Sequence, residues 1–359
     1  MSGTTVSPPI APSPALEVRA CDAGQDGERD AFVRAHPRGT VFHLAGWRRA
    51  VLSAFRHAPR DLAAVEGGRI VGLLPLARCR KLPTGADLVS VPYGVYGGPI
   101  GESPEIERAL VAEAVALGKR EKVGRVELRC VRDPGVPGLA ASELYATFVR
   151  ELPATPDEVM TRMPKRARAE VRKAIEKHGL VMEEGTRFVP DLARLFGESK
   201  QRLGSPGLPR AWFEALATEL GDACACHAAV RAGEVVAATM SFVLGDTICF
   251  YYIGTSAEAN RTYNATNFLT TRLQEWGVGK GLRRFDLSRS RVGTGSFSFK
   301  ENQGFTPTPL AYRYALIGSQ GLPALTPSNP RTKILRDAWT RLPGWLARGL
   351  SGRLSRYLP

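Results

Sequence analysis

Apolar and polar residues follow the same pattern in two separate stretches of the chain. Residues 64–74 and residues 229–239 each read as a strand, a tight turn that contains glycine, and a longer strand, which predicts a β-hairpin. Behind each hairpin we expect a helix, at 104–119 and 264–278, and then a short strand, at 125–128 and 284–287. The same elements in the same order, twice, predict a duplicated α/β unit.

The repeat sets the expected domain organisation. We expect a first lobe over residues 16–152 and a second lobe over 153–318, with the join near a Pro-rich stretch at 151–156. Residues 1–15 are rich in Pro, Ser and Thr and predict a disordered leader. Residues 319–359 predict a basic amphipathic tail, whose helix Pro343 and Gly344 should break into two pieces. The tail either packs back onto a lobe or contacts an anionic membrane.

Composition narrows the class of protein and of partner. Hydrophobic residues make up 43% of the 359 residues and charged residues 23%, as in a globular protein. The net charge of +14 favours a phosphorylated ligand, nucleic acid or an anionic membrane surface. We see neither a secretory signal nor an apolar run long enough to span a membrane, so we expect a cytoplasmic protein, with peripheral contact at the inner face of the cytoplasmic membrane. The six cysteines are scattered and the histidines lack metal-ligand spacing, so we expect no metal site.

A run of basic residues follows the join between the lobes. A helix opened by Pro164 carries Lys165 and Arg166 among its six cations, with Val171 and Ile175 on an apolar side. A charge run of this kind is either a solvated helix face or a phosphate-binding face, and the pattern does not choose between them.

The best candidate chemistry lies between residues 285 and 305. No catalytic triad, P-loop or dinucleotide fingerprint stands out, which favours direct transfer between bound substrates. Ligands of open α/β sheets bind beyond the carboxyl ends of strands, where this chain places Asp286, Ser288, Arg289 and Ser290. Arg289 and Lys300 offer positive charge to an anion or a developing oxyanion. The alternative is that Asp286 and Arg289 form a structural ion pair.

These motifs resemble a known family. Gly281, the Phe-Asp-Leu strand end at 285–287, the Phe-Lys pair at 299–300 and the Gly-Phe pair at 304–305 resemble the BioF2-like (Acetyltransf_6) branch of the GNAT acyltransferases. More closely, the chain resembles FemAB-like proteins associated with exosortase (PEP-CTERM) and exopolysaccharide systems. That likeness covers residues 40–359 and rests on the sequences at 42–44, 93–99, 163–168, 293–296 and 328–330.

The resemblance implies two tandem GNAT-like α/β domains with mixed, mostly antiparallel sheets, followed by the helical tail. It implies direct transfer of an activated acyl group to an amine, with acyl-CoA or aminoacyl-tRNA as co-substrate and no tightly bound cofactor. One departure matters: residues 260–267 lack the glycines that usually hold the CoA pyrophosphate, which places CoA binding in doubt. Fem-type proteins share this departure. The predicted catalytic residues are Asp286, Arg289 and Lys300, and the predicted substrate-binding residues are Tyr93, Tyr96, Lys165, Arg166, Tyr252, Asn267, Ser288 and Ser290.

Three functions therefore compete. The leading hypothesis is an acyl or aminoacyl transferase that acts on a nucleotide- or lipid-linked precursor of envelope polysaccharide or peptidoglycan, with tRNA as one form of the donor. The second is a non-catalytic GNAT-fold scaffold in exopolysaccharide assembly, which an apolar filling of the cleft between the lobes would favour. The third is nucleic-acid binding as the main task, which the charge permits but no recognition motif supports.

Overall fold

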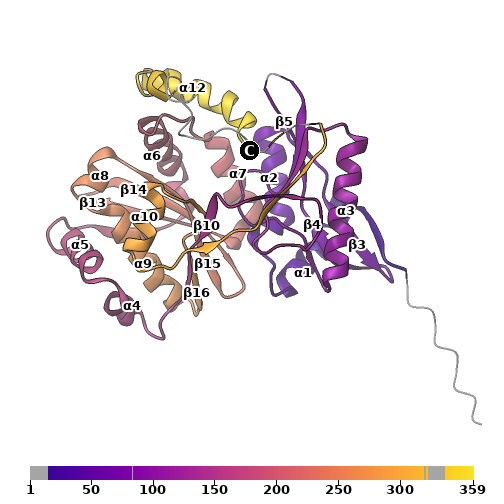
Figure 1. Ribbon diagram of the computed structural model, residues 1–359. Coiled ribbons are helices and arrows are strands. Elements are labelled where there is room, and N and C mark those ends of the chain that lie inside the picture. The colour runs from indigo at the N-terminus through magenta and orange to yellow at the C-terminus, as the bar shows by residue number, and fades with distance from the viewer. Residues whose placement is uncertain (1–14, 83, 319–320, 322–335) are drawn as a thin grey trace, which may run out of the picture.

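Two α/β lobes lie side by side, the first coloured indigo to purple and the second magenta to orange (Figure 1). The computed structural model describes residues 15–82, 84–318, 321 and 336–359. Except for residue 15, the predicted leader lies outside the described residues, as does the motif at 328–330.

In the described residues, the first lobe has one antiparallel sheet, one mixed sheet and three α-helices. Its four-stranded sheet has the order β1 (Glu17–Ala20), β3 (Leu62–Glu66), β4 (Arg69–Leu74), β7 (Ile100–Gly101). Its six-stranded sheet has the order β2 (Ala58–Pro59), β5 (Ala77–Arg80), β6 (Ala86–Val89), β8 (Arg125–Leu128), β19 (Tyr312–Leu316), β9 (Ala140–Ser142). The helices are α1 (Asp26–Ala35), α2 (Ala45–Phe55) and α3 (Pro104–Arg120).

The second lobe is built around one six-stranded sheet. The order is β11 (Val149–Glu151), β16 (Arg284–Asp286), β15 (Thr247–Thr255), β14 (Glu234–Leu244), β13 (Cys224–Arg231), β12 (Val181–Glu184). The helices are α4 (Pro156–Arg162), α5 (Lys165–Glu176), α6 (Val189–Arg202), α7 (Arg210–Leu220), α8 (Ala257–Arg261), α9 (Ala265–Gly279) and α10 (Gly295–Asn302). A small sheet of β17 (Ser290–Arg291), β10 (Tyr145–Thr147) and β18 (Thr308–Pro309) lies between the lobes. Short 3-10 helices are η1 (Ala23–Gln25), η2 (Val41–His43), η3 (Thr186–Phe188), η4 (Gly221–Ala223) and η5 (Ser355–Tyr357).

The predicted duplication of an α/β unit is confirmed. Both hairpins form, as β3–β4 and β13–β14, and the two expected helices are α3 and α9. Each lobe then has one parallel strand pair in an otherwise antiparallel sheet, β6 with β8 and β15 with β16. Residues 295–302, for which the sequence pattern predicted no helix, form α10.

The lobes exchange strands, which the sequence pattern did not indicate. Strand β11, at the end of the first segment, pairs with β16 of the second lobe, while β19, at the end of the second segment, pairs with β8 of the first lobe. Both exchanged strands are antiparallel to strands that occupy the same place in the two halves of the repeat. Each sheet is therefore completed by the other half of the chain, so the two lobes are held together by backbone hydrogen bonds.

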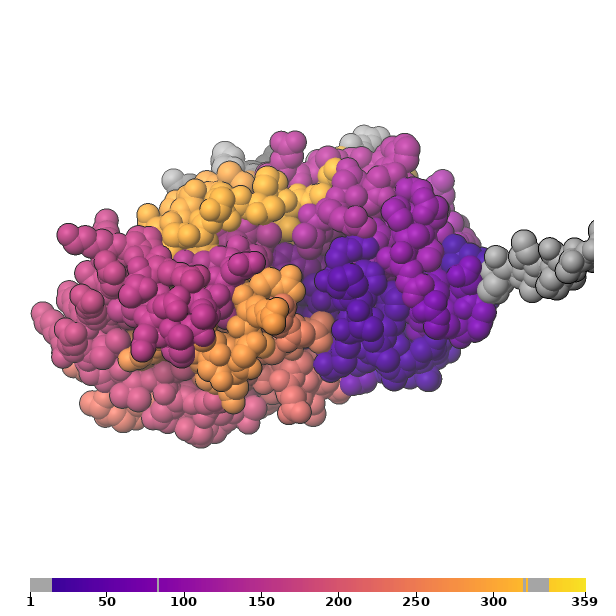
Figure 2. All heavy atoms as spheres, turned by 90° about the horizontal axis from the view of Figure 1, so that it is seen from below, coloured from indigo at the N-terminus to yellow at the C-terminus, as the bar shows by residue number. Residues whose placement is uncertain are grey.

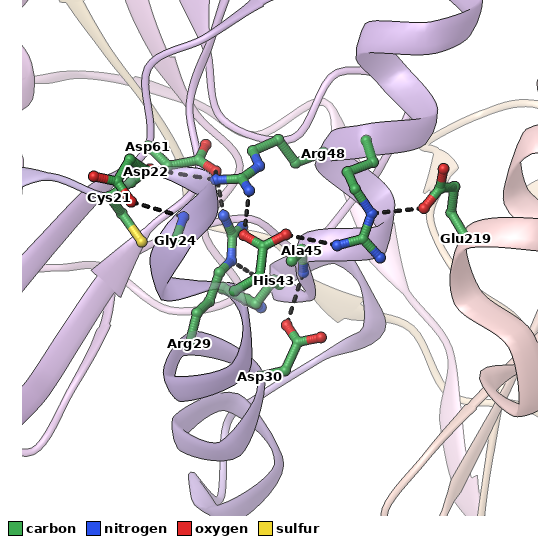
Figure 3. A network of polar contacts seen from close by, with 12 residues as sticks. Cys21, Asp22, Gly24, Arg29, Asp30, His43, Ala45, Arg48, Asp61 and Glu219 are labelled. Atoms are coloured by element: carbon green, nitrogen blue, oxygen red, sulfur yellow. Dashed lines mark hydrogen bonds and ion pairs between the residues drawn. The ribbon is translucent and has the colours of Figure 1, made fainter.

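Side chains also join the lobes, where α2 lies beside α7 (Figure 1). Arg29 is fully buried, forms an ion pair with Asp61, and donates to the carbonyl oxygen of His43 at 2.8 Å. Arg49 reaches outward from the same group of charges to Glu219 of α7, at 2.6 Å (Figure 3). Buried charges are retained in proteins when they are paired and hydrogen-bonded, as these are.

The tail packs on both lobes. Helix α12 (Gly344–Leu354) begins directly after Pro343, as expected, and lies against α6 (Figure 1). Residues 336–340 form the preceding helical piece. Tyr93 of the first lobe donates its hydroxyl to the carbonyl oxygen of Ser355 at 3.1 Å. Among the described residues, the helices are all too short or too polar to cross a membrane.

Candidate functional site

The parallel strands β15 and β16 of the second lobe pair over only three residues and then separate. Strands β15 and β16 are paired from Thr247 and Arg284 up to Cys249 and Asp286, where the pairing ends. Strand β15 continues, but the chain after β16 turns away toward β17. The register between β14 and β15 also shifts, so that Tyr251 is an extra residue, a β-bulge, just beyond the opening. A splayed pair with a bulge gives a ligand access to backbone groups in mid-sheet.

Asp286 lies where the two strands separate and is only 4% exposed. Its Oδ1 accepts hydrogen bonds from the Ser288 amide at 2.6 Å, the Tyr96 hydroxyl at 3.1 Å and the Thr147 hydroxyl at 3.3 Å. Burial raises the pKa of this carboxyl above its ordinary value, an effect that these hydrogen bonds oppose. All three donors reach Oδ1, while Oδ2 accepts none of these bonds; the Cys249 thiol is a further hydrogen-bonding neighbour of the carboxyl.

Lys300 fixes the turn that follows Asp286. Ser288 has a left-handed backbone, with φ of 63°, which is rare for a residue with a side chain and marks a constrained turn. From α10, Lys300 donates to the carbonyl oxygens of Ser288 at 2.8 Å and Arg289 at 3.1 Å. Burial lowers the pKa of Lys300 to about 8, despite the nearby charge of Asp286. Lys300 therefore holds the strand end in position.

Asp286 and Arg289 do not form the structural ion pair that was the alternative. Arg289 turns away and donates to the Tyr312 hydroxyl at 3.0 Å, with its guanidinium 4.4 Å from the centre of the Tyr145 ring. Asp286 and Arg289 therefore have different partners, and they line different cavities at the strand end.

Three cavities surround this strand end. The α9 cavity, of about 710 Å³, lies between the N-terminus of α9, helix α6 and the turn at residues 287–290. The tail cavity, of about 350 Å³, is bordered by Tyr93, Arg129, Tyr252 and the last residues of the tail. These two share Lys200, Tyr251 and Arg289 in their walls, so they meet there.

The Asp286 cavity, of about 670 Å³, opens on the other side and is walled by both lobes. The first lobe contributes residues 33–43 and Tyr96, and the second contributes Asp286 and Cys249 at its base. Figure 2 looks onto the seam where indigo atoms of the first lobe meet salmon and orange atoms of the second.

The structure gathers most of the predicted site residues around these cavities. Asn267, Ser288, Arg289, Ser290 and Lys300 line the α9 cavity. Tyr93 and Tyr252 line the tail cavity, and Tyr96 and Asp286 line the Asp286 cavity. Lys165 and Arg166 are exposed on α5, Arg166 beside Glu170, and line none of the cavities found in the described part of the chain. The substrate-binding role predicted for those two residues thus has no cavity to support it.

Other residues of the site were missed. Thr147 and Arg129 come from the first half of the chain and reach the site only because the lobes pack together. Lys200 is one of several basic residues on α6, and no sequence pattern distinguishes it from the others. The bulge at Tyr251 depends on strand register, which the sequence does not display.

Glu170 is a further residue of the site that was not predicted. It places a negative charge beside the N-terminus of α9. Its carboxylate forms a hydrogen bond with the Asn267 side-chain amide, and it lines the α9 cavity. Gln303 donates to the other side of the same Asn267 amide, at 2.9 Å. A carboxylate here occupies the favourable position for negative charge at the start of a helix.

Comparisons with known proteins agree with this geometry. Residues 161–301 match the acetyltransferase (GNAT) domain family. No curated protein sequence matches the chain. Among solved structures, FemX aligns with a TM-score of 0.62 at 14% identity, covering 84% of this chain and 98% of FemX.

Two further structures align over most of the chain. A tandem GNAT protein from the clavulanic acid biosynthesis pathway has a TM-score of 0.52 at 16% identity, covering 86% of this chain and 100% of that one. The C-terminal domain of a putative lysylphosphatidylglycerol synthetase from Agrobacterium fabrum has a TM-score of 0.52 at 14% identity, covering 81% and 92%. The chain therefore has the tandem GNAT fold, and its second lobe carries the matched acetyltransferase domain.

Proposed function

We propose that this protein is an N-acyltransferase that moves an activated acyl or aminoacyl group onto an amine of an envelope polysaccharide or peptidoglycan precursor. The observation that carries the proposal is Asp286 at the opening of the β15–β16 pair, with one cavity on each side of the strand end. Two bound substrates can meet there. The open, partly polar cavities also argue against the scaffold alternative, for which an apolar filling would be expected.

The chemistry needs a base, an oxyanion site and a leaving group. In the proposed reaction the acceptor amine enters from the Asp286 cavity and attacks the acyl carbonyl carbon. A C–N bond forms, the amine proton passes to Oδ2 of Asp286, and the bond from the acyl carbon to sulfur or oxygen of the donor breaks. The oxyanion faces the bulge at Tyr251, where an extra peptide group of β15 meets the α9 cavity. The leaving group then takes up a proton from water, and Asp286 releases the proton that it received, which restores the carboxylate.

The donor occupies the α9 cavity in this scheme. Without glycines at 260–267, and with Glu170 beside the start of α9, the position that a CoA pyrophosphate would take carries negative charge. Electrostatics therefore favours a donor other than CoA, and aminoacyl-tRNA is the one that the resemblance to Fem-type proteins suggests. Of the three solved structures described above, FemX also has the highest TM-score, 0.62.

The test is a transfer assay with purified protein. Each of two donors, acetyl-CoA and a mixture of charged tRNAs, is combined with nucleotide-linked amino sugars and with lipid-linked or nucleotide-linked muropeptides, and products are read by mass spectrometry. A product with a new amide bond that is lost in Asp286→Asn supports the proposal. Absence of transfer with every pair, under conditions where the protein is folded, would overturn it.

The tail adds a second, separable part of the proposal: contact with an anionic membrane. Trp345 is 69% exposed, and Arg341, Arg348 and Arg353 of the tail are also exposed. An exposed Trp among cations suits the headgroup region of a bilayer. Sedimentation with phosphatidylglycerol vesicles should bind the protein, and Trp345→Ser should reduce binding. Equal binding to neutral phosphatidylcholine vesicles, or no binding at all, would contradict this part.

A further inference from the structure

Two cations share the place where the α9 cavity and the tail cavity meet. They are Lys200, near the end of α6, and Arg289, in the turn after β16. Both are half-buried, and both line both cavities. Their positions come from different parts of the chain and are fixed by tertiary packing.

Neither cation has a carboxylate partner within the described part of the chain. Lys200 lies 5.2 Å above the centre of the Phe196 ring, one helical turn earlier, and has no hydrogen bond from its ammonium group to another described residue. The Arg289 guanidinium donates one hydrogen bond within the described residues, to the Tyr312 hydroxyl, and otherwise lies over the rings of Tyr145 and Tyr312. Aromatic rings attract cations but leave their charge uncompensated.

The acidic groups of the site have partners other than Lys200 and Arg289. Asp286 lines the cavity on the other side of the strand end, and its bonds go to Tyr96, Thr147 and Ser288. Glu170 lines the α9 cavity, where Asn267 and Arg166 are its partners. The terminal residue Pro359 lines the tail cavity, and its carbonyl oxygen accepts a hydrogen bond from Arg129 at 2.9 Å. Two like charges therefore line the same junction. Consistently, burial and then the positive charge of Arg289 hold the pKa of Lys200 below its ordinary value.

Two half-buried like charges raise the free energy of the folded protein unless an anion neutralises them. Removing a charge from water is unfavourable, and a second charge of the same sign adds to the cost. A doubly charged tetrahedral oxyanion would neutralise both cations at once. The planar guanidinium can donate two parallel hydrogen bonds to such a group, and the ammonium acts as a point charge.

We propose that Lys200 and Arg289 form a phosphate-binding subsite at the junction of the α9 and tail cavities. The Ser288 hydroxyl lies in the same wall and can donate a further hydrogen bond. This inference rests on the proposed function, because the subsite would hold a phosphate group of one of the two substrates close to the reaction centre. The phosphate belongs either to the donor or to a nucleotide- or lipid-linked acceptor.

The test is calorimetric titration of the whole protein with inorganic pyrophosphate, at low salt. We expect saturable binding to the wild type, weakened by about 10- to 100-fold in Lys200→Met and in Arg289→Gln, since each change removes a charged hydrogen-bond donor. Lys200→Arg should bind within about threefold of the wild type. Lys119→Met, an exposed lysine on α3, is the matched control and should bind as the wild type does. Thermal unfolding verifies that each variant is folded.

Further titrations identify the source of the phosphate. If uridine diphosphate binds in the same Lys200-dependent manner and desulfo-CoA does not, the phosphate is that of the acceptor; the reverse result assigns it to a CoA-type donor. Binding of a short RNA ending in CCA, again dependent on Lys200, assigns it to a tRNA donor. No binding of pyrophosphate by the wild type, or equal binding by Lys200→Met, overturns the subsite. Because these titrations need no turnover, failure of the transfer assay alone leaves their outcome intact.

Discussion

The two lobes end their parallel strand with nearly the same sequence and use it differently. In the first lobe, Glu127 of β8 forms an ion pair with Arg129 at 2.8 Å, and Arg129 also donates to the carbonyl oxygens of Val91 and Gly94. In the second lobe, Asp286 occupies the matching place in β16 and accepts from two hydroxyls and an amide, while Arg289 has a single tyrosine partner.

The difference separates a structural strand end from a chemical one. In the first lobe the acid and the base neutralise each other and tie down their own loop. In the second lobe they are kept apart, so that each faces a cavity with its charge available. The strand end of the first lobe is thus held by its own paired charges, whereas that of the second lobe keeps charged groups beside two cavities.

The largest expected effect tests this comparison directly. Asp286→Asn should lower kcat/KM by about 10²- to 10⁴-fold, because a general base is lost, while changing the midpoint of thermal unfolding little. The matched change in the first lobe, Glu127→Gln, should leave kcat/KM near that of the wild type and lower the free energy of unfolding by about 1–3 kcal/mol, since Arg129 loses its carboxylate. Equal kinetic effects of the two changes would remove the distinction between the lobes.

The next effect is on stability at alkaline pH. With a pKa of about 8 in the folded protein and 10.5 ordinarily, Lys300 releases its proton first in the folded state. The unfolded state then binds more protons between pH 8 and 10.5, so this group makes stability rise with pH in that window, by up to about 3 kcal/mol. Urea unfolding at several pH values should show that the wild type gains this stability relative to Lys300→Met. Parallel curves for the two proteins would mean that Lys300 is ordinarily solvated.

A third prediction concerns the exchanged strand β19. Tyr312 is fully buried, donates to the Val95 carbonyl oxygen at 2.8 Å and accepts from Arg289. Tyr312→Phe should lower the free energy of unfolding by about 1–3 kcal/mol, because a buried carbonyl and a guanidinium lose their partner. Tyr314→Phe on the same strand is the control, since its hydroxyl has no hydrogen bond within the described part of the chain. Similar losses in both variants would indicate a packing effect.

The smallest effect tests what the Tyr96 hydroxyl does for Asp286, to which it donates a hydrogen bond. Tyr96→Phe removes one hydrogen bond that lowers the pKa of Asp286, so that pKa should rise further. The acid limb of the pH–rate profile should move to higher pH, and kcat at neutral pH should fall by about tenfold. A lower rate with an unmoved acid limb would assign Tyr96 to substrate binding and not to the tuning of Asp286.

Local patterns explain why much of the site could be predicted. The motif from Phe285 to Ser290 ends a strand of a recognisable repeat, and the ends of such strands are where ligands bind, so Asp286, Ser288 and Arg289 could be singled out. Lys165 and Arg166 show the limit of that reasoning, because a basic helix reads the same whether it faces a cavity or water. Lys200 shows the reverse, since its surroundings depend on which elements pack against α6.

The sequence alone determined the duplicated α/β units, the bounds of α3 and α9 to within about a turn, and the polar strand end, because these follow from the spacing of apolar residues and from local turn chemistry. The tertiary structure decided the strand exchange, the bulge at Tyr251 and the contact of Tyr96 and Thr147 with Asp286. These features join residues far apart in the chain. They depend on which surfaces bury each other best, and no local pattern records that choice.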